Sequence, residues 1–204
     1  MLTLSRKGAC DLRGLPGPVM IVGAAHSGKS EAGHLALSPD LDALVLGTAD
    51  QSEPELRPRI ETLKAQRPQR WLVQENIDSL AEAVALAADR HPQVLVDSLS
   101  QWFGGMIAKG LNRYSLDQLR NILDHEAAEL CKVLQGAPKS RIVILSSEVG
   151  AGVTPALKVP RLFREALGRA NCRVAAASRS VVLMSCGLPY PLKTEGPPLA
   201  ELAA

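Results

Sequence analysis

Short apolar runs alternate along this chain with longer stretches in which leucine and alanine recur at three- and four-residue intervals. The short runs fit buried strands, and the longer stretches fit helices that bury one face. Strands are predicted at Val19 to Gly23, Ala43 to Gly47, Gln69 to Gln74, Gln93 to Asp97, Arg141 to Ser146 and Ser180 to Cys186. Helices are predicted at Lys29 to Leu37, Glu55 to Gln66, Ile77 to Arg90, Leu116 to Leu134 and Pro160 to Ala177. This alternation predicts an α/β fold, with a mostly parallel sheet and helices on both faces.

The two ends of the chain depart from that pattern. Residues 1–17 and 188–204 are together rich in proline and glycine, with one lysine each. Segments of this kind stay poorly ordered unless a neighbouring element holds them. A chain of 204 residues has the size of one domain. The prediction is therefore an N-terminal extension (1–17), one domain (18–187) and a C-terminal tail (188–204).

The residues after the first predicted strand carry the most specific motif. They read G-A-A-H-S-G-K-S and match the phosphate-loop pattern G-x-x-x-x-G-K-[S/T]. In such a loop, backbone N–H groups and the positive end of the next helix bind phosphates, a lysine adds charge, and a hydroxyl ligates Mg²⁺. Lys29 is therefore predicted to contact phosphate and Ser30 to ligate Mg²⁺, although a glycine turn without a ligand is the alternative. The predicted nucleotide-binding residues here are Gly23, Ala24, Ala25, His26, Ser27, Gly28, Lys29 and Ser30.

Two carboxylates stand where the active edge of the sheet is expected. Asp97 ends the run V-L-V-D, where it can complete the Mg²⁺ shell or, alternatively, cap the helix that follows Ser98. Glu148 follows the fifth predicted strand in the glycine-rich stretch E-V-G-A-G. There it can orient a hydroxyl nucleophile or a metal-bound water. A purely structural turn is the alternative for Glu148.

Composition narrows the classes of partner. The formal net charge is +2, with acidic and basic residues interspersed, which argues against a nucleic-acid-binding face. The cysteines at 10, 131, 172 and 186 lack C-x-x-C spacing and are expected to be free thiols in a reducing compartment. The charged N-terminus does not fit a signal peptide, and no run of about 18 apolar residues fits a membrane span. A soluble cytoplasmic protein is expected.

Further motifs occur in order between residues 18 and 187. After the phosphate loop come L-G-T-A from Leu46, R-I from Arg59, R-P-Q-R-W from Arg67, Glu75, D-S-L-S-Q-W from Asp97, E-V-G-A-G-V-T-P from Glu148 and R-L-F-R-E-A-L-G-R-A-N from Arg161. With these motifs the chain resembles the bifunctional adenosylcobinamide kinase and adenosylcobinamide-phosphate guanylyltransferase family of cobalamin biosynthesis. The E-V-G-x-G-V-x-P element together with a phosphate loop is far more specific than the loop alone.

The resemblance implies a RecA-like P-loop fold, a homotrimer and two reactions. The first phosphorylates the aminopropanol hydroxyl of adenosylcobinamide with ATP or GTP. The second transfers GMP from GTP to that phosphate through a guanylyl-histidine intermediate. By the same resemblance, the nucleotide also contacts Thr48, Ala49, Asp50, Lys64, Glu75 and Asp97, and Mg²⁺ is held by Ser30 and Asp97. Candidate catalytic residues are Lys29, Asp97 and Glu148.

One departure from the family pattern concerns the guanylylated histidine. When R-I at 59–60 is aligned, its position holds Thr62, and no histidine occurs between His34 and His91. An imidazole can attack a phosphoryl centre and leave again, whereas a threonine hydroxyl needs a base and forms a stable ester. The covalent route is therefore predicted to be lost. His26 in the phosphate loop is a conceivable substitute nucleophile, but a phosphate contact fits its place better.

Two more departures lie in regions expected to border the acceptor site. Ser147 stands before E-V-G where the family usually carries asparagine, and F-G-G-M follows Trp102 where the family often has an asparagine and leucines. The resulting hypothesis is a divergent member that keeps nucleotide binding and the kinase step but has lost histidine-mediated guanylylation. The alternatives are a nucleotide-binding protein without transferase activity and a kinase for another small-molecule alcohol.

Overall fold

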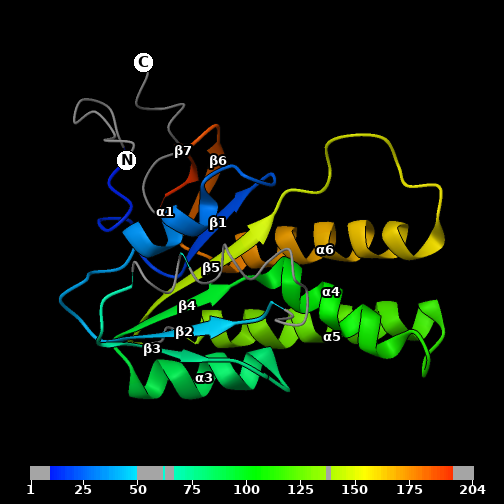
Figure 1. Cartoon of the computed structure of the whole chain (residues 1–204), viewed down its shortest axis with the longest axis horizontal. Helices are drawn as coiled ribbons and strands as arrows, with labels where there is room; N and C mark the ends of the chain where they lie inside the picture. The colour runs from blue at the N-terminus through cyan, green and yellow to red at the C-terminus, as the bar shows by residue number, and fades with distance from the viewer. Residues whose placement is uncertain (1–9, 50–61, 63–66, 137–138, 195–204) are drawn as a thin grey trace.

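The computed structural model describes residues 10–49, 62, 67–136 and 139–194. This part of the chain forms a seven-stranded sheet in the order β3-β2-β4-β5-β1-β6-β7 (Figure 1). The strands are β1 (Val19–Gly23), β2 (Ala43–Gly47), β3 (Trp71–Gln74), β4 (Gln93–Asp97), β5 (Arg141–Ser147), β6 (Ser180–Ser185) and β7 (Leu188–Lys193). The helices are α1 (Lys29–Leu35), α3 (Leu80–Arg90), α4 (Leu99–Gly110), α5 (Leu116–Gln135) and α6 (Lys158–Ala177). Adjacent strands are parallel except for β6 and β7.

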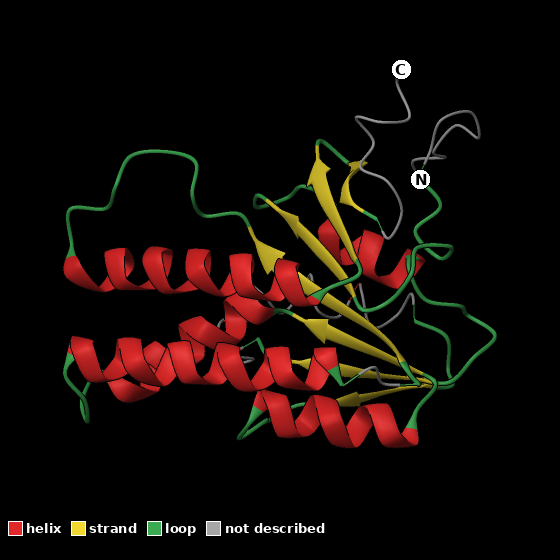
Figure 2. Cartoon of the chain, turned by 180° about the vertical axis from the view of Figure 1, so that it is seen from behind, coloured by secondary structure: helices red, strands yellow, loops and turns green. Residues whose placement is uncertain are grey.

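Helices cover both faces of the sheet (Figure 2). Helices α3, α4, α5 and α6 pack on one face, where Met20 and Val22 of β1 point, and α1 packs on the other, where Val19 and Ile21 point. The α/β prediction is confirmed, and the six predicted strands agree with the observed bounds to within a few residues. The helix predicted at Glu55 to Gln66 lies outside the described residues, apart from Thr62.

The described end of the predicted N-terminal extension packs against the sheet. Leu12 and Leu15 are buried in the core on the α1 side. Arg141, at the start of β5, donates hydrogen bonds of 2.7 Å to the carbonyl oxygens of both leucines and of 2.8 Å to that of Ala36. A neighbouring element therefore holds residues 10–17, which is the condition under which such a segment becomes ordered.

Strand β7 lies within the predicted C-terminal tail. Cys186 and Gly187 join β6 to β7 with φ angles of 51° and 79°, as a type I′ hairpin turn requires. The prolines of β7 are tolerated because it is the edge strand. Lys193 Nζ donates hydrogen bonds to carbonyl oxygens at the end of α6. The turn and these tertiary contacts, rather than local composition, order the segment.

The sequence pattern does not predict α4, because its twelve residues include three glycines, and glycine costs up to about 1 kcal/mol in a helix. The Ser98 hydroxyl caps the helix by accepting a hydrogen bond from the Gln101 N–H. Leu99, Phe103 and Ile107 are buried on one face of α4. Burial of these large apolar side chains outweighs the glycine cost.

Two expectations drawn from composition can be compared with the structure. All four cysteines are free thiols, as predicted. Within the described ranges, no helix has both the length and the apolar character needed to cross a membrane.

Candidate functional site

The phosphate loop connects the end of β1 to the first residue of α1. Gly28 precedes the helix with a left-handed φ of 91°, a conformation that favours glycine. A Cβ at Gly23 would lie 2.5 Å from Ser27 Oγ and 2.6 Å from the Met184 carbonyl oxygen. The path of the loop therefore requires both glycines.

Lys29 and Ser30 are buried at the start of α1, with exposed fractions of 8% and 6%. Lys29 Nζ donates a hydrogen bond of 3.0 Å to the Ala24 carbonyl oxygen, so the ammonium group lies over the loop. Ser27 Oγ is also buried, and it has no hydrogen-bond partner among the described residues. An unsatisfied buried hydroxyl is unfavourable, and a bound phosphate oxygen would satisfy it.

The β6–β7 hairpin turn packs on the phosphate loop. The Gly187 N–H donates a hydrogen bond of 3.0 Å to the Ser27 carbonyl oxygen. A Cβ at Gly28 would lie 3.3 Å from Gly187 Cα, so the two backbones are in close contact. The hairpin, whose second strand falls in the predicted tail, therefore supports the loop directly.

Asp97 ends β4, and β5 lies between β4 and β1. Two strand spacings place the ends of β1 and β4 about 10 Å apart, a gap that a hydrated Mg²⁺ can span. Ser98, not Asp97, caps α4, so the alternative role of Asp97 as the N-cap is wrong. Thr48, just after β2, holds the end of β4 through hydrogen bonds. Its N–H donates to the Asp97 carbonyl oxygen at 3.1 Å, and its hydroxyl donates to the Ser98 carbonyl oxygen and accepts from the Ser98 N–H.

A chain of hydroxyl groups links the ends of β4 and β5. Ser98 Oγ lies 2.8 Å from Ser100 Oγ, which accepts a hydrogen bond of 3.0 Å from Ser147 Oγ. Asn171 of α6 accepts from the Ser146 hydroxyl and donates to the Ser147 carbonyl oxygen. Ser147 therefore bonds to neighbouring elements and does not line the pocket described below.

Glu148 follows β5, and its N–H donates a hydrogen bond of 3.0 Å to the Gly23 carbonyl oxygen. Its exposed carboxylate accepts a hydrogen bond from the Gly150 N–H. Arg164 of α6 donates to the carbonyl oxygens of Gly150, Gly152 and Val153. Glu148 is thus next to the phosphate loop through its backbone, while its carboxylate stabilises its own turn, as the structural alternative predicts.

Arg67 is half-buried. It contacts His34 and interacts electrostatically with the carboxylates of Asp97 and Glu75. Its Nε donates a hydrogen bond of 3.2 Å to His34 Nε2. Burial lowers the pKa of Arg67, and the carboxylates of Asp97 and Glu75 oppose that shift. The His34 ring meets Trp71 edge to face, with ring centroids 5.7 Å apart. The R-P-Q-R-W motif therefore places an arginine at the acidic edge of the site, a role that the sequence alone did not assign.

The pH dependence of stability should report on His34. Burial, followed by the charge of Arg67, lowers the pKa of His34 to about 4, whereas the unfolded value is about 6.5. The unfolded state then binds more protons, so the stabilisation is complete above pH ~6.5 and is lost as pH falls towards 4. The free energy of unfolding should fall by roughly 2.5 kcal/mol more in wild type than in His34→Gln between pH ~7.5 and ~4.5. Urea titrations of both proteins measure this difference, and equal slopes would contradict it.

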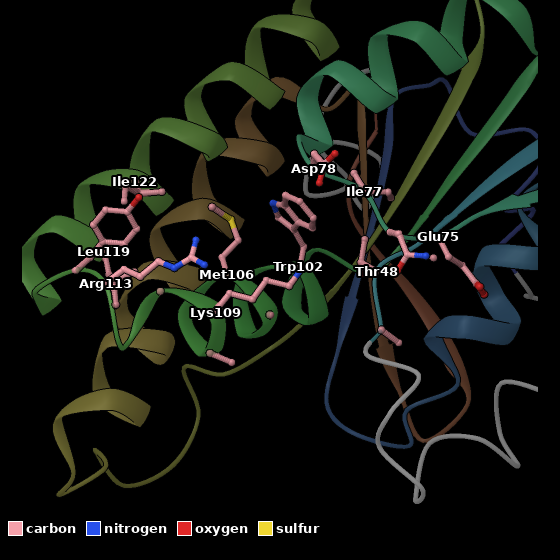
Figure 3. Close-up of a pocket in the computed structure, with 17 residues that line it drawn as sticks. Thr48, Glu75, Ile77, Asp78, Trp102, Met106, Lys109, Arg113, Leu119 and Ile122 are labelled. Atoms are coloured by element: carbon pink, nitrogen blue, oxygen red, sulfur yellow. The ribbon is translucent and has the colours of Figure 1, made fainter.

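A pocket of about 670 Å³ opens beside this edge of the sheet (Figure 3). One wall comes from the end of β2 and the loop between β3 and α3, and the other comes from α4 and the start of α5. The lining residues include Thr48, Ala49, Glu75, Trp102, Gly105, Met106, Lys109 and Arg113. Two residues of the F-G-G-M stretch, Gly105 and Met106, therefore line a pocket, whereas Ser147 does not.

The structure brings some predicted site residues together and leaves others apart. Thr48, Ala49 and Glu75 line the pocket, and the phosphate loop lies at the same edge of the sheet (Figure 1). Asp50 and Lys64 lie outside the described residues. Thr62 is helical and exposed, and His26 is exposed on the phosphate loop. Sequence reasoning did not identify Trp102, Lys109 and Arg113 as site residues, although the motif D-S-L-S-Q-W ends at Trp102 and the unusual F-G-G-M stretch follows it.

The oxygen donors at this edge fit Mg²⁺. Ser30 offers a hydroxyl and Asp97 a carboxylate, and no cluster of three or more His, Cys, Asp or Glu able to hold a metal occurs in the described ranges. Mg²⁺ usually keeps several waters and takes one or two protein oxygens together with substrate phosphates. A Mg²⁺ site here therefore does not require a full set of protein ligands.

Comparisons with known proteins point to one family. Residues 19–192 match the model of the family described as cobinamide kinase / cobinamide phosphate guanyltransferase. The bifunctional adenosylcobalamin biosynthesis protein CobP of Pseudomonas aeruginosa is 32% identical over 177 residues, which is 86% of this chain and 97% of that protein. The corresponding CobU of Escherichia coli is 24% identical over 180 residues, 86% of this chain and 99% of that protein.

Solved structures support the fold. A prototypical ATPase from the type III secretion system of pathogenic bacteria aligns with a TM-score of 0.51 at 13% identity, covering 81% of this chain and 50% of its own. At this identity the likeness concerns the fold alone, and it agrees with the predicted P-loop architecture.

Proposed function

Because the chain belongs to the cobinamide kinase / cobinamide phosphate guanyltransferase family, we propose that it phosphorylates the aminopropanol hydroxyl of adenosylcobinamide with ATP or GTP. The observation that carries this function is the phosphate loop, with Lys29 and Ser30 buried at its base and Asp97 at the same edge of the sheet. The names of the relatives, which refer to adenosylcobalamin biosynthesis, support a corrinoid acceptor.

The kinase step depends on positioning and charge neutralisation. The loop N–H groups, the Ser27 hydroxyl and Lys29 hold the phosphates in line with the acceptor hydroxyl. Ser30 and Asp97 would hold Mg²⁺, which would supply neutralisation of the phosphate charge. Asp97 or Glu148 accepts the proton of the attacking hydroxyl. For Glu148 this requires its carboxylate to leave the Gly150 N–H.

We further propose that guanylyl transfer through a covalent histidine is lost. The support is Thr62 at the position of the family's nucleophile, because a threonine ester does not break down as a phosphoramidate does. The family resemblance supports a homotrimer and GTP as well as ATP as the nucleotide. The cysteines without C-x-x-C spacing support a reducing compartment and with it a cytoplasmic location.

The test is to incubate the purified protein with adenosylcobinamide, Mg²⁺ and either ATP or GTP, and to identify the corrinoid products by mass. Adenosylcobinamide phosphate alone is the expected product. Adenosylcobinamide-GDP would contradict the loss of guanylyl transfer. No product with either nucleotide would contradict the kinase assignment and favour a nucleotide-binding protein or a kinase for another alcohol.

A further inference from the structure

The pocket beside α4 contains a buried hydrogen-bond donor that no described residue satisfies. Trp102 is 8% exposed, it lines the pocket, and its Nε1 has no hydrogen-bond partner among the described residues. Figure 3 shows this nitrogen on the side of the ring that faces Met106 and Arg113. Met106, which lies on the same side of the ring, is unbranched and flexible. A buried N–H left unpaired is unfavourable, and an acceptor atom of a ligand would satisfy it.

Two cations line the α4 side of the pocket. Lys109 comes from the last turn of α4, and Arg113 follows that helix. Neither side chain forms an ion pair with a residue in the part of the chain that the structure describes. The pocket also has carboxylates, but Figure 3 shows Glu75 and Asp78 on the opposite side of the Trp102 ring from Arg113. The pocket therefore has an acidic end and a basic end.

Gly105 keeps the pocket open. It lies inside α4, where glycine is unfavourable, and no atom lies within 4 Å of the position that its Cβ would take. Close packing therefore does not require this glycine. It differs from Gly110 on the same helix, where an added Cβ would lie 2.4 Å from Leu119 Cδ2. Gly105 therefore leaves open space at the wall of the pocket.

We propose that the basic end of this pocket binds the phosphate monoester of the acceptor, namely the phosphorylated aminopropanol arm of the corrinoid. Lys109 and Arg113 supply the charge and Trp102 Nε1–H a further donor, which suits a dianion with several acceptor oxygens. Thr48 and Glu75, the nucleotide contacts expected from the family resemblance, line the other end of the pocket. The apolar side chain of Met106, which lies between the two ends in Figure 3, suits the methyl and methylene groups of the arm. This inference rests on the proposed corrinoid acceptor.

Equilibrium dialysis tests the proposal without requiring turnover, with bound corrinoid measured by its absorbance. Wild-type protein should bind adenosylcobinamide phosphate at least about tenfold more tightly than adenosylcobinamide, since charge-assisted hydrogen bonds of this kind are worth a factor of ten or more. The double variant Lys109→Gln/Arg113→Gln should lose most of that preference. Trp102→Phe should weaken binding of the phosphate form by about tenfold, because it removes one donor and leaves an aromatic side chain. Affinity for GTP should stay unchanged in both variants.

Matched controls separate the pocket from general charge and folding effects. Arg120→Gln/Lys132→Gln removes two cations that belong to exposed ion pairs on α5 and should keep the preference for the phosphate form. Gly105→Leu should narrow the pocket and weaken binding of adenosylcobinamide phosphate. Gly168→Leu, at a glycine of α6 that also has open space around it, should not change it.

The outcomes distinguish the inference from the function on which it rests. If wild type binds adenosylcobinamide phosphate and the pocket variants bind it equally well, the pocket assignment is overturned while the proposed function stands. If the variants lose GTP affinity to the same extent as corrinoid affinity, the pocket is a nucleotide site and the assignment is again overturned. If wild type binds neither corrinoid, the proposed acceptor is wrong and the inference falls with it.

Discussion

Replacing Lys29 with alanine should lower the kcat of adenosylcobinamide phosphorylation by about a hundredfold or more, since a preorganised charge at a transferring phosphoryl group contributes on this scale. Lys29 Nζ lies over the phosphate loop, 3.0 Å from the Ala24 carbonyl oxygen. In that place its charge can meet the phosphates with little reorganisation. The measurement is the initial rate of corrinoid phosphate formation at saturating nucleotide.

The loss must be separated from unfolding, because Lys29 is buried. Lys29→Met keeps most of the side-chain volume without the charge, so its urea midpoint should stay near that of wild type while its kcat falls as far as that of Lys29→Ala. His125→Gln changes an exposed residue on α5 and should leave the rate unaltered. Unchanged turnover in Lys29→Met would reject the role of Lys29.

The second large effect is expected at Thr62. Wild-type protein incubated with α-labelled GTP should acquire no acid-labile, alkali-stable label, whereas Thr62→His should acquire it. The reason is that an imidazole forms and releases a phosphoramidate near neutral pH, which a threonine hydroxyl does not. Thr62 is exposed, so the larger ring can be accommodated. The measurement is covalent radioactivity after denaturation, with each sample split between acid and alkali.

Thr62→Ala is the control for Thr62→His and should remain unlabelled. Label on wild-type protein would mean that another residue, with His26 as the first candidate, has taken over the nucleophile's role. An unlabelled Thr62→His variant would contradict the view that this one substitution accounts for the loss, and it would point to further changes around the guanylyl site.

Much of the fold and the phosphate loop could be predicted because their signals are local. The runs at Val19 to Val22 and Val94 to Val96 are apolar throughout, as expected for strands buried on both faces. The glycines of G-A-A-H-S-G-K-S reflect backbone geometry that few other residues allow. The family resemblance added Thr48 and Glu75, which line the pocket.

The remaining features depend on partners far away in sequence. Helix α4 forms in spite of its glycines because Leu99, Phe103 and Ile107 are buried in the core. Arg67 reaches His34 across more than thirty residues, and no pattern at either position indicates the pair. The buried, unpartnered nitrogen of Trp102 could be recognised only once its surroundings were known.

The sequence by itself determined the α/β class, the position of the phosphate loop and the absence of the family's histidine, since each depends on residue identity and short-range periodicity. Only the tertiary structure decided that Leu188–Lys193 is a strand whose hairpin supports the loop, that Ser98 caps α4 in place of Asp97, and that a pocket with a basic end adjoins the sheet. The physical reason is that side-chain burial, hydrogen-bond partners and open space are set by packing between distant segments, which outweighs local preference when the two disagree.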